Sequence, residues 1–160
     1  SCRSPIQGAP VSGEETTNFR ALVINAATKR LVRRRARNRC EYCLLSQVAM
    51  RVPTLHIEHI RPKQHGGVDD VANLCLACHH CNAHKGTNLT GVDPRTGQIV
   101  LLFHPRLEAW REHFSWDGFR ITGSTAVGRA TVAVLAMNEP DRVRLRRQLH
   151  EEGILRRHGR

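Results

Sequence analysis

The run CHHCNAHKG at residues 78–86 decides the fold of this chain. It begins with a Cys-x2-Cys pair, Cys78 and Cys81, and a second pair of the same spacing lies upstream at Cys40 and Cys43. A Zn2+ ion takes four nitrogen or sulfur ligands in a tetrahedron, and two such pairs from distant chain positions supply a full set. The spacing therefore predicts a structural zinc ribbon.

Two further cysteines leave alternatives open. Cys75 precedes the second pair by three residues and could replace Cys78 as a ligand, although in a strand it would more often be a small buried hydrophobe. Cys2 stands alone near the start. The plainer alternative for the paired cysteines is four buried free thiols, but paired spacing that occurs twice favours zinc. A disulfide-bonded secreted toxin is disfavoured, because residues 1–17 do not read as a secretory signal and the spacing is that of metal sites.

Hydrophobic patterning extends the prediction outward from residue 78. Residues 54–60 alternate and suit a short strand, residues 73–77 suit its partner strand, and a polar helix follows that ends at Gly86. Upstream, we expect a helix capped by Thr28 and stopped by Asn38. Downstream, we expect strands at 99–103 and 119–121, a helix from Pro105 to Phe114, and helices at 125–137 and 139–152 with Asn138 as a cap between them.

A set of motifs between and around the cysteine pairs resembles the HNH endonuclease family. They are the segment 40–43, His56-Ile57-Glu58-His59-Ile60, Gly66-Gly67, Asp70, Asn73-Leu74 and the run 78–86, in the family's order. The resemblance implies an α+β fold with a small ββα-metal (His-Me finger) core, a structural zinc ribbon and peripheral C-terminal helices. Residues 101–106 and 116–129 also look like the C-terminal extension of a group of bacterial HNH proteins.

The resemblance implies roles for four residues. His59 is expected to be the general base, Glu58 stands where the family usually has a metal-binding Asp, and Asn82 stands at the second ligand position. Asn73 is expected to brace the loop between the strands and so to orient the base. The implied products are 3′-hydroxyl and 5′-phosphate ends.

Elementary chemistry agrees with these roles. A neutral imidazole can take a proton from the attacking water, while a divalent cation relieves the charge that develops on the leaving oxygen. Oxygen ligands from Glu58 and Asn82 suit Mg2+ or Mn2+ better than a second zinc. Taken alone, Glu58 and His59 would be interpreted as a solvated charged pair at a strand end. The cysteine pairs on either side favour the interpretation that the two residues are catalytic.

Charge points to a polyanionic partner. The 160 residues include 25 Lys and Arg against 14 Asp and Glu, a formal net charge of +11. Seven basic residues fall between Lys29 and Arg39 with no acidic residue among them, which is typical of a contact with a phosphate backbone. The DNA contacts that we expect come from Arg33, Arg34, Arg37, His56 and Lys85. The other histidines, His65, His79 and His80, are expected to be ordinary surface residues.

These patterns define one expectation and one rival. We expect a disordered lead-in at 1–17 and a single nuclease domain at 18–160, with its core at about 28–90 and its extension at 91–160. The longest apolar stretch, 131–137, is far too short to span a bilayer, and we expect a cytoplasmic protein that acts on DNA as a monomer or homodimer. The rival is a non-catalytic zinc-ribbon module that binds nucleic acid.

Overall fold

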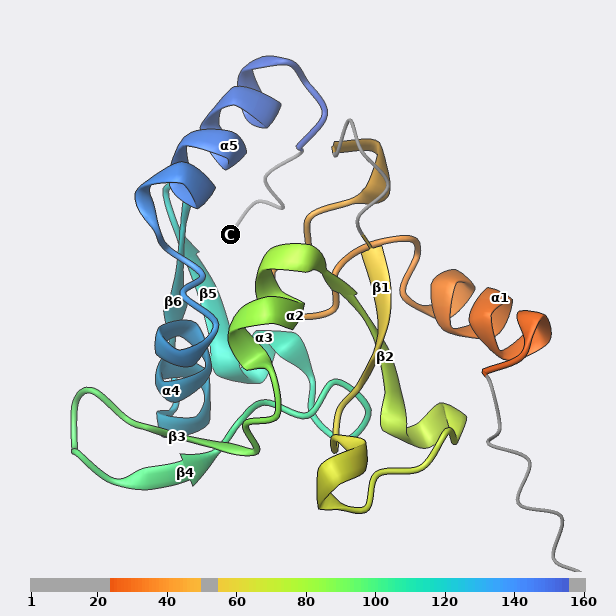
Figure 1. Ribbon diagram of the computed structural model, residues 1–160. Coiled ribbons are helices and arrows are strands. Elements are labelled where there is room, and N and C mark those ends of the chain that lie inside the picture. Colours follow the sequence, from red (N-terminus) through yellow and green to blue (C-terminus); the bar gives the residue numbers. More distant parts are fainter. Residues whose placement is uncertain (1–23, 50–54, 156–160) are drawn as a thin grey trace, which may run out of the picture.

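The computed structural model describes residues 24–49 and 55–155 (Figure 1). The lead-in expected at residues 1–17, and Cys2 within it, lie outside the described residues. Three two-stranded antiparallel sheets and five α-helices make up the described part. The mixture of helices and small sheets confirms the α+β prediction.

The centre of the fold is a ββα unit. Strand β1 (Leu55–His59) pairs antiparallel with β2 (Leu74–Cys78), and helix α2 (His79–Lys85) follows β2 without a loop. The register sets Glu58 opposite Cys75. All of β2 is buried, whereas β1 is buried only at Leu55, so β1 presents its polar residues at one edge of the core. Gly86 ends α2 with a φ of 48°, a backbone region that glycine enters without strain.

Helix α1 (Ala26–Arg35) lies on the other side of this hairpin from α2 in the view of Figure 1. Its N-cap is Asn25, whose Oδ1 accepts the backbone N–H of Thr28, so the prediction that Thr28 caps the helix was wrong. Asn25 takes the role because it lies in extended backbone one residue before the helix starts. The left-handed conformation predicted at Asn38 is confirmed, with a φ of 50°, but the helix ends earlier, at Arg35 with Ala36 as its C-cap, and Arg37 is the first left-handed residue.

Three short 3-10 helices fill the connections: η1 (Gln47–Ala49), η2 (Lys63–His65) and η3 (Val71–Asn73). The last two lie in the loop that joins β1 to β2. The side chain of Asp70 accepts the backbone N–H of Ala72 at the start of η3 and so fixes the entry into β2.

The C-terminal extension is built on two hairpins and three helices. Strand β3 (Thr90–Val92) pairs with β4 (Ile99–Leu101), and β5 (Phe114–Asp117) pairs with β6 (Arg120–Gly123). Helix α4 (Ala126–Val134) packs on β6 and on the β3–β4 hairpin, and α5 (Pro140–Glu151) closes the described part. The two terminal helices were predicted from sequence and are confirmed.

Two predicted details in this extension were wrong. Helix α3 spans only Trp110–His113 and does not begin at Pro105, because Arg106 is drawn into an ion pair with Glu41 and Glu108 accepts the backbone N–H of His104. Asn138 does not cap α5. Its side-chain amide instead pairs with both the N–H and the C=O of Ile121 in β6, and Glu139 occupies the N-cap position.

One apolar core joins the ββα unit to the extension. The Tyr42 and Phe103 rings meet edge to face with centroids 6.4 Å apart, and Trp110 Nε1 donates to the Tyr42 carbonyl at 2.8 Å. Leu135, Met137 and Leu149 belong to the same cluster of buried residues as Leu76. None of the helices within residues 24–49 and 55–155 has the length and apolar character that a membrane crossing requires.

Candidate active site and metal centre

The two cysteine pairs meet in space. Cys40, Cys43, Cys78 and Cys81 are buried, and their sulfur atoms all lie within 4.8 Å of one another. Two sulfurs bound to one Zn2+ at ~2.3 Å and at the tetrahedral angle are about 3.8 Å apart. The Sγ atoms of Cys43 and Cys78 are 3.7 Å apart, which fits that geometry and is far too long for a disulfide. The predicted four-cysteine set is confirmed as a possible zinc site.

Backbone turns shape each half of this cluster. The N–H of Cys43 points at the sulfur of Cys40 at 3.5 Å, and the N–H of Cys81 points at the sulfur of Cys78 at 3.4 Å. Such contacts stabilise negative charge on the sulfur that accepts them. The alternative ligand Cys75 is not part of the cluster, since its sulfur faces the Tyr42 hydroxyl and burial raises its pKa to about 12.

Arg142 of α5 brings a positive charge to the cluster. Its Nη2 lies 3.6 Å from the sulfur of Cys78 and 3.9 Å from that of Cys43. Within the cluster the pKa of the Cys43 thiol is held well below its ordinary value, first by its hydrogen bond with Cys40 and then by those with the other two cysteines, and Arg142 adds to the effect. The pKa values of Cys40 and Cys81 are raised, that of Cys40 first by burial and that of Cys81 first by its hydrogen bond with Cys40. Through Arg142, the C-terminal extension supports the thiolate form that a metal needs.

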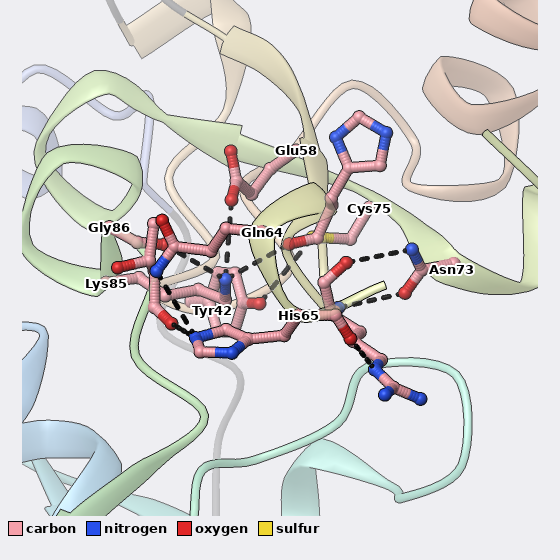
Figure 2. A network of polar contacts seen from close by, with 11 residues as sticks. Tyr42, Glu58, Gln64, His65, Asn73, Cys75, Lys85 and Gly86 are labelled. Atoms are coloured by element: carbon pink, nitrogen blue, oxygen red, sulfur yellow. Dashed lines mark hydrogen bonds and ion pairs between the residues drawn. The ribbon is translucent and has the colours of Figure 1, made fainter. Parts of the chain in front are cut away.

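Glu58 lies at the edge of β1 above helix α2. Its Oε1 receives a hydrogen bond from Lys85 Nζ at 3.3 Å, and the same ammonium group donates to the carbonyl oxygens of His59 and Gly86 (Figure 2). Burial raises the pKa of Glu58, and the nearby Lys85 opposes that shift. The other carboxylate oxygen, Oε2, receives no hydrogen bond from the described part of the chain.

His59 is the next residue, and its ring meets the β1–β2 loop. Its Nε2 lies 2.6 Å from Oδ1 of Asp69, and Lys63 Nζ holds the other Asp69 oxygen at 3.0 Å. The pKa of Asp69 is lowered first by the hydrogen bond with His59 and then by that with Lys63. A carboxylate can only accept, so Nε2 carries the hydrogen, and in the neutral ring Nδ1 holds the free lone pair.

Asn73 lies across the loop that carries Asp69. Its Oδ1 accepts the backbone N–H of Arg61 at 2.8 Å, and its Nδ2 donates to the Arg61 carbonyl at 3.0 Å (Figure 2). Nδ2 also donates to the carbonyl of Val68 at 3.0 Å. These three bonds tie the exit of β1 to the backbone just before Asp69. Asn73 therefore has the bracing geometry expected of it, while its effect on the base stays a prediction.

Asn82 lies on α2, three residues before Lys85, and so on the same side of the helix as Lys85. It is half-buried, and its side-chain amide has no hydrogen-bond partner among residues 24–49 and 55–155. The structure thus places the Asn82 helix face beside Glu58. No hydrogen bond joins the side chains of Asn82 and Glu58.

The residues expected to contact DNA fall into three groups. Arg34 and Arg37 are exposed on or just after α1, and His56 is exposed on β1 with its ring 5.8 Å from that of His79. Arg33 is half-buried and donates to the Leu55 carbonyl at 3.0 Å, so it also anchors α1 to the sheet. The prediction that Lys85 contacts DNA is not supported: only 2% of Lys85 is exposed, because its ammonium group is bonded inside the site.

Residues 40–88 match the family model of the HNH endonucleases. The matched segment contains all four clustered cysteines together with Glu58, His59, Asn73 and Asn82, and the resemblance to HNH endonucleases is confirmed for it. The HNH match supports nuclease-type activity in general.

One curated relative also matches. The chain is 27% identical over 108 residues to the Septu protein PtuB of Bacillus thuringiensis, an alignment that covers 66% of this chain. It covers 39% of the length of PtuB. The search of solved structures gave no significant match.

Sequence reasoning missed two residues at this site, Asp69 and Arg142. Asp69 stands next to Asp70, and only the path of the loop decides which of the two faces His59. Arg142 lies far along the chain in a run of arginines that reads as the outer face of a helix. Neither carries a sequence signal that could have identified it.

Proposed function

We propose that this chain is a metal-dependent HNH endonuclease that hydrolyses phosphodiester bonds in DNA. The observation that carries the proposal is the arrangement at the end of β1, where Glu58 faces α2 and His59 is paired with Asp69 inside the segment that matches the HNH family. A carboxylate and a carboxylate-oriented imidazole side by side are the groups that such hydrolysis needs.

His59 acts as the general base through Nδ1. The oxygen of a water molecule attacks phosphorus as its proton passes to Nδ1, and the bond from phosphorus to the 3′ oxygen breaks. The leaving oxygen takes a proton from solvent, which gives 3′-hydroxyl and 5′-phosphate ends. Asp69 accepts the Nε2–H throughout, so it holds the ring orientation and stabilises the imidazolium that forms.

Glu58 and Asn82 would hold the catalytic cation. The free Oε2 of Glu58 and the unpaired amide oxygen of Asn82 are hard donors, which fits Mg2+ or Mn2+. The ion, when bound, supplies positive charge to the phosphate and to the leaving oxygen. Lys85 keeps the Glu58 carboxylate in place through Oε1 and does not engage Oε2.

The cysteine cluster is proposed to hold structural Zn2+, and exposed arginines are proposed to bind the DNA backbone. Arg34 lies on α1 and Arg37 just after it, and the exposed Lys29 and Arg30 of the same helix add further positive charge. Phosphate contacts of this kind position a duplex without reading its sequence. A single site of this kind would nick one strand per encounter.

The test is relaxation of supercoiled plasmid by protein freed of loosely held metal, with and without added Mg2+ or Mn2+. We expect nicking only with added metal. His59→Ala should lower the rate by about 10²- to 10⁴-fold, the range for a lost general base, while still binding DNA. His79→Ala, which removes an exposed histidine outside the pair, is the matched control and should cut normally.

The same assay decides against the rival zinc-ribbon binding module. If the wild type shifts DNA in a gel but never cuts it with either metal, the nuclease proposal is wrong. If His59→Ala cuts as well as the wild type, the base is another residue.

A further inference from the structure

A second group of metal-binding side chains lies outside the site described above. His80 and His84 on α2 and Glu139 at the start of α5 each offer one donor atom, and these atoms lie within 4.8 Å of one another. We propose that His80, His84 and Glu139 form a binding site for a Zn2+-like transition metal ion that joins α2 to the α4–α5 connection.

The first argument is the spacing of the two histidines. They are four residues apart on α2 and so share one face of the helix. Their ring centroids are 4.1 Å apart. Two imidazoles four residues apart on a helix can bind one ion together once the rings turn their lone pairs toward it, and imidazole suits zinc, copper and nickel.

The second argument is that backbone carbonyls fix which ring nitrogens are free. His80 Nε2 is 3.0 Å from the carbonyl oxygen of Ala136, and His84 Nδ1 is 2.9 Å from the carbonyl oxygen of His80. A carbonyl oxygen only accepts, so both of these nitrogens carry hydrogen. The lone pairs are left on His80 Nδ1 and His84 Nε2. Metal-binding histidines characteristically donate their other N–H to a carbonyl or carboxylate in this way.

The third argument is that two acceptor atoms, one from His84 and one from Glu139, face each other. The free Nε2 of His84 lies 3.5 Å from Oε1 of Glu139. Two lone-pair atoms that face each other repel unless a cation lies between them, either a proton or a metal ion. Two donors bound to one zinc at ~2.0–2.1 Å and at the tetrahedral angle are about 3.4 Å apart, close to the separation seen here.

The backbone around Ala136 supports the same conclusion. Ala136 has a φ of 47°, a left-handed conformation that is unfavourable for a non-glycine residue. The bend directs its carbonyl oxygen at His80 and brings Glu139 next to His84. The neighbouring Arg142 is turned toward the sulfurs of Cys43 and Cys78, so its charge is engaged by the cysteine cluster.

The experiment measures the number of Zn2+ ions bound. Protein that carries one tightly held zinc is titrated with Zn2+ in excess Mg2+, which keeps the candidate catalytic site occupied. We expect a second equivalent in the wild type. His84→Ala and Glu139→Gln should each weaken its binding by about 100-fold or more, since loss of a ligand exceeds the effect of losing its supporting hydrogen bond.

Two further variants locate the second ion. His79→Ala, an exposed histidine of the same helix outside the group, should keep both equivalents. Glu58→Gln should also keep both, because the proposed ion is not at the catalytic carboxylate. Retention of the first zinc and an unchanged far-UV circular dichroism spectrum establish that each variant is folded.

Three results would overturn the proposal. If the wild type binds a single equivalent, the group of His80, His84 and Glu139 does not bind a metal ion. If the second equivalent survives in both His84→Ala and Glu139→Gln, it binds elsewhere. If it is lost in Glu58→Gln alone, it belongs to the catalytic site. None of these results depends on whether the protein cuts DNA.

Discussion

At the scale of single residues, the pairing of His59 with Asp69 gives the imidazole a defined tautomer. Only Nδ1 can accept a proton while Nε2 is engaged, so the orientation of the base is set before substrate arrives. The short loop that carries Asp69 is in turn held by the three hydrogen bonds of Asn73.

The role of Asp69 is testable by an isosteric change. Asp69→Asn should lower kcat by about 10²-fold or more with KM little changed, because an amide can donate to Nε2 and so favour the wrong tautomer. Asp69→Glu should recover part of the rate. Lys63→Gln, which removes the other partner of Asp69, is the control. If it is equally damaging, Asp69 acts by holding the loop rather than by orienting the ring.

A second residue-scale prediction concerns Asp93, which is fully buried between Arg129 and the turn at 93–97. Arg129 donates to both carboxylate oxygens, at 2.8 and 2.7 Å, and holds the pKa of Asp93 far below its usual range. A lowered folded-state pKa stabilises the protein above the unfolded value near ~3.9, and that stability is lost as pH falls toward the folded value.

Urea unfolding of the wild type and Asp93→Asn at pH 7, 5 and 3 measures this effect. The variant should be less stable at pH 7 and 5, and the difference between the two proteins should shrink at pH 3. Taking the difference cancels acid effects on the cysteine cluster. Asp141→Asn, which removes an exposed i,i+3 pair with Arg144, should give little difference at any pH.

At the scale of elements, helix α1 carries two kinds of arginine. Arg33 and Arg35 donate to carbonyls of the β1–β2 hairpin, whereas Arg34 and Arg37 are exposed. The half-buried pair positions the helix, and the exposed pair is left to meet a phosphate backbone.

This division predicts opposite behaviour of neighbouring variants. In a His59→Ala background that binds without cutting, Arg34→Gln and Arg37→Gln should each weaken DNA binding and lower the slope of log affinity against log salt by about 1, with stability unchanged. Arg33→Gln should lower the melting temperature instead. An unchanged salt slope in both exposed variants would place the DNA elsewhere on the surface.

The β1–β2 loop is also constrained by one glycine. A Cβ on Gly67 would lie 1.7 Å from the Arg61 carbonyl oxygen, inside the group of atoms that Asn73 binds. Gly67→Ala should therefore cost about 1–3 kcal/mol, as overpacking does, and should impair cutting at temperatures where the protein stays folded. The control is Gly97→Ala, whose methyl meets nothing within 4 Å but whose φ of 72° strains any side chain; it should lose some stability yet cut normally while folded. Melting temperature and plasmid relaxation are measured on both.

The elements around the cysteines were predictable because their signals are local. Alternation marks β1, and Gly86 ends α2. Apart from the N-cap, which is Asn25 rather than Thr28, the errors arose where distant residues decide the outcome. Arg106 leaves a helical start to pair with Glu41, and Asn138 leaves a capping role to pair with Ile121. Two features of the sites could not be predicted for the same reason. The contact of Asp69 with His59, and that of Glu139 with the histidines of α2, depend on how the intervening chain folds and not on the spacing of these residues in the sequence.

At the scale of the whole molecule, the cysteine cluster joins the turn at 40–43 to the junction of β2 and α2, at the centre of the shared core. Buried thiols left without a metal lose the interaction that holds these segments together.

Chelation of zinc should therefore unfold both halves in one transition. Trp110, which donates to Tyr42, and Trp116, whose ring lies 5.7 Å from the Arg146 guanidinium, both belong to the extension. Their fluorescence should change together with the far-UV circular dichroism signal, and both should recover when Zn2+ is restored. A fold that keeps its helix content after complete metal removal would contradict this prediction.

The guanidinium of Arg142 beside the cysteine sulfurs has a consequence for modular transfer. Residues 40–88 hold the matched segment, yet the positive charge beside its thiolates and the indole bound to Tyr42 come from α5 and α3. A graft of that segment onto an unrelated scaffold would carry the chemical groups but leave their electrostatic support behind. Recombination that preserves activity is thus expected to exchange residues 40–88 together with a stretch reaching at least α5.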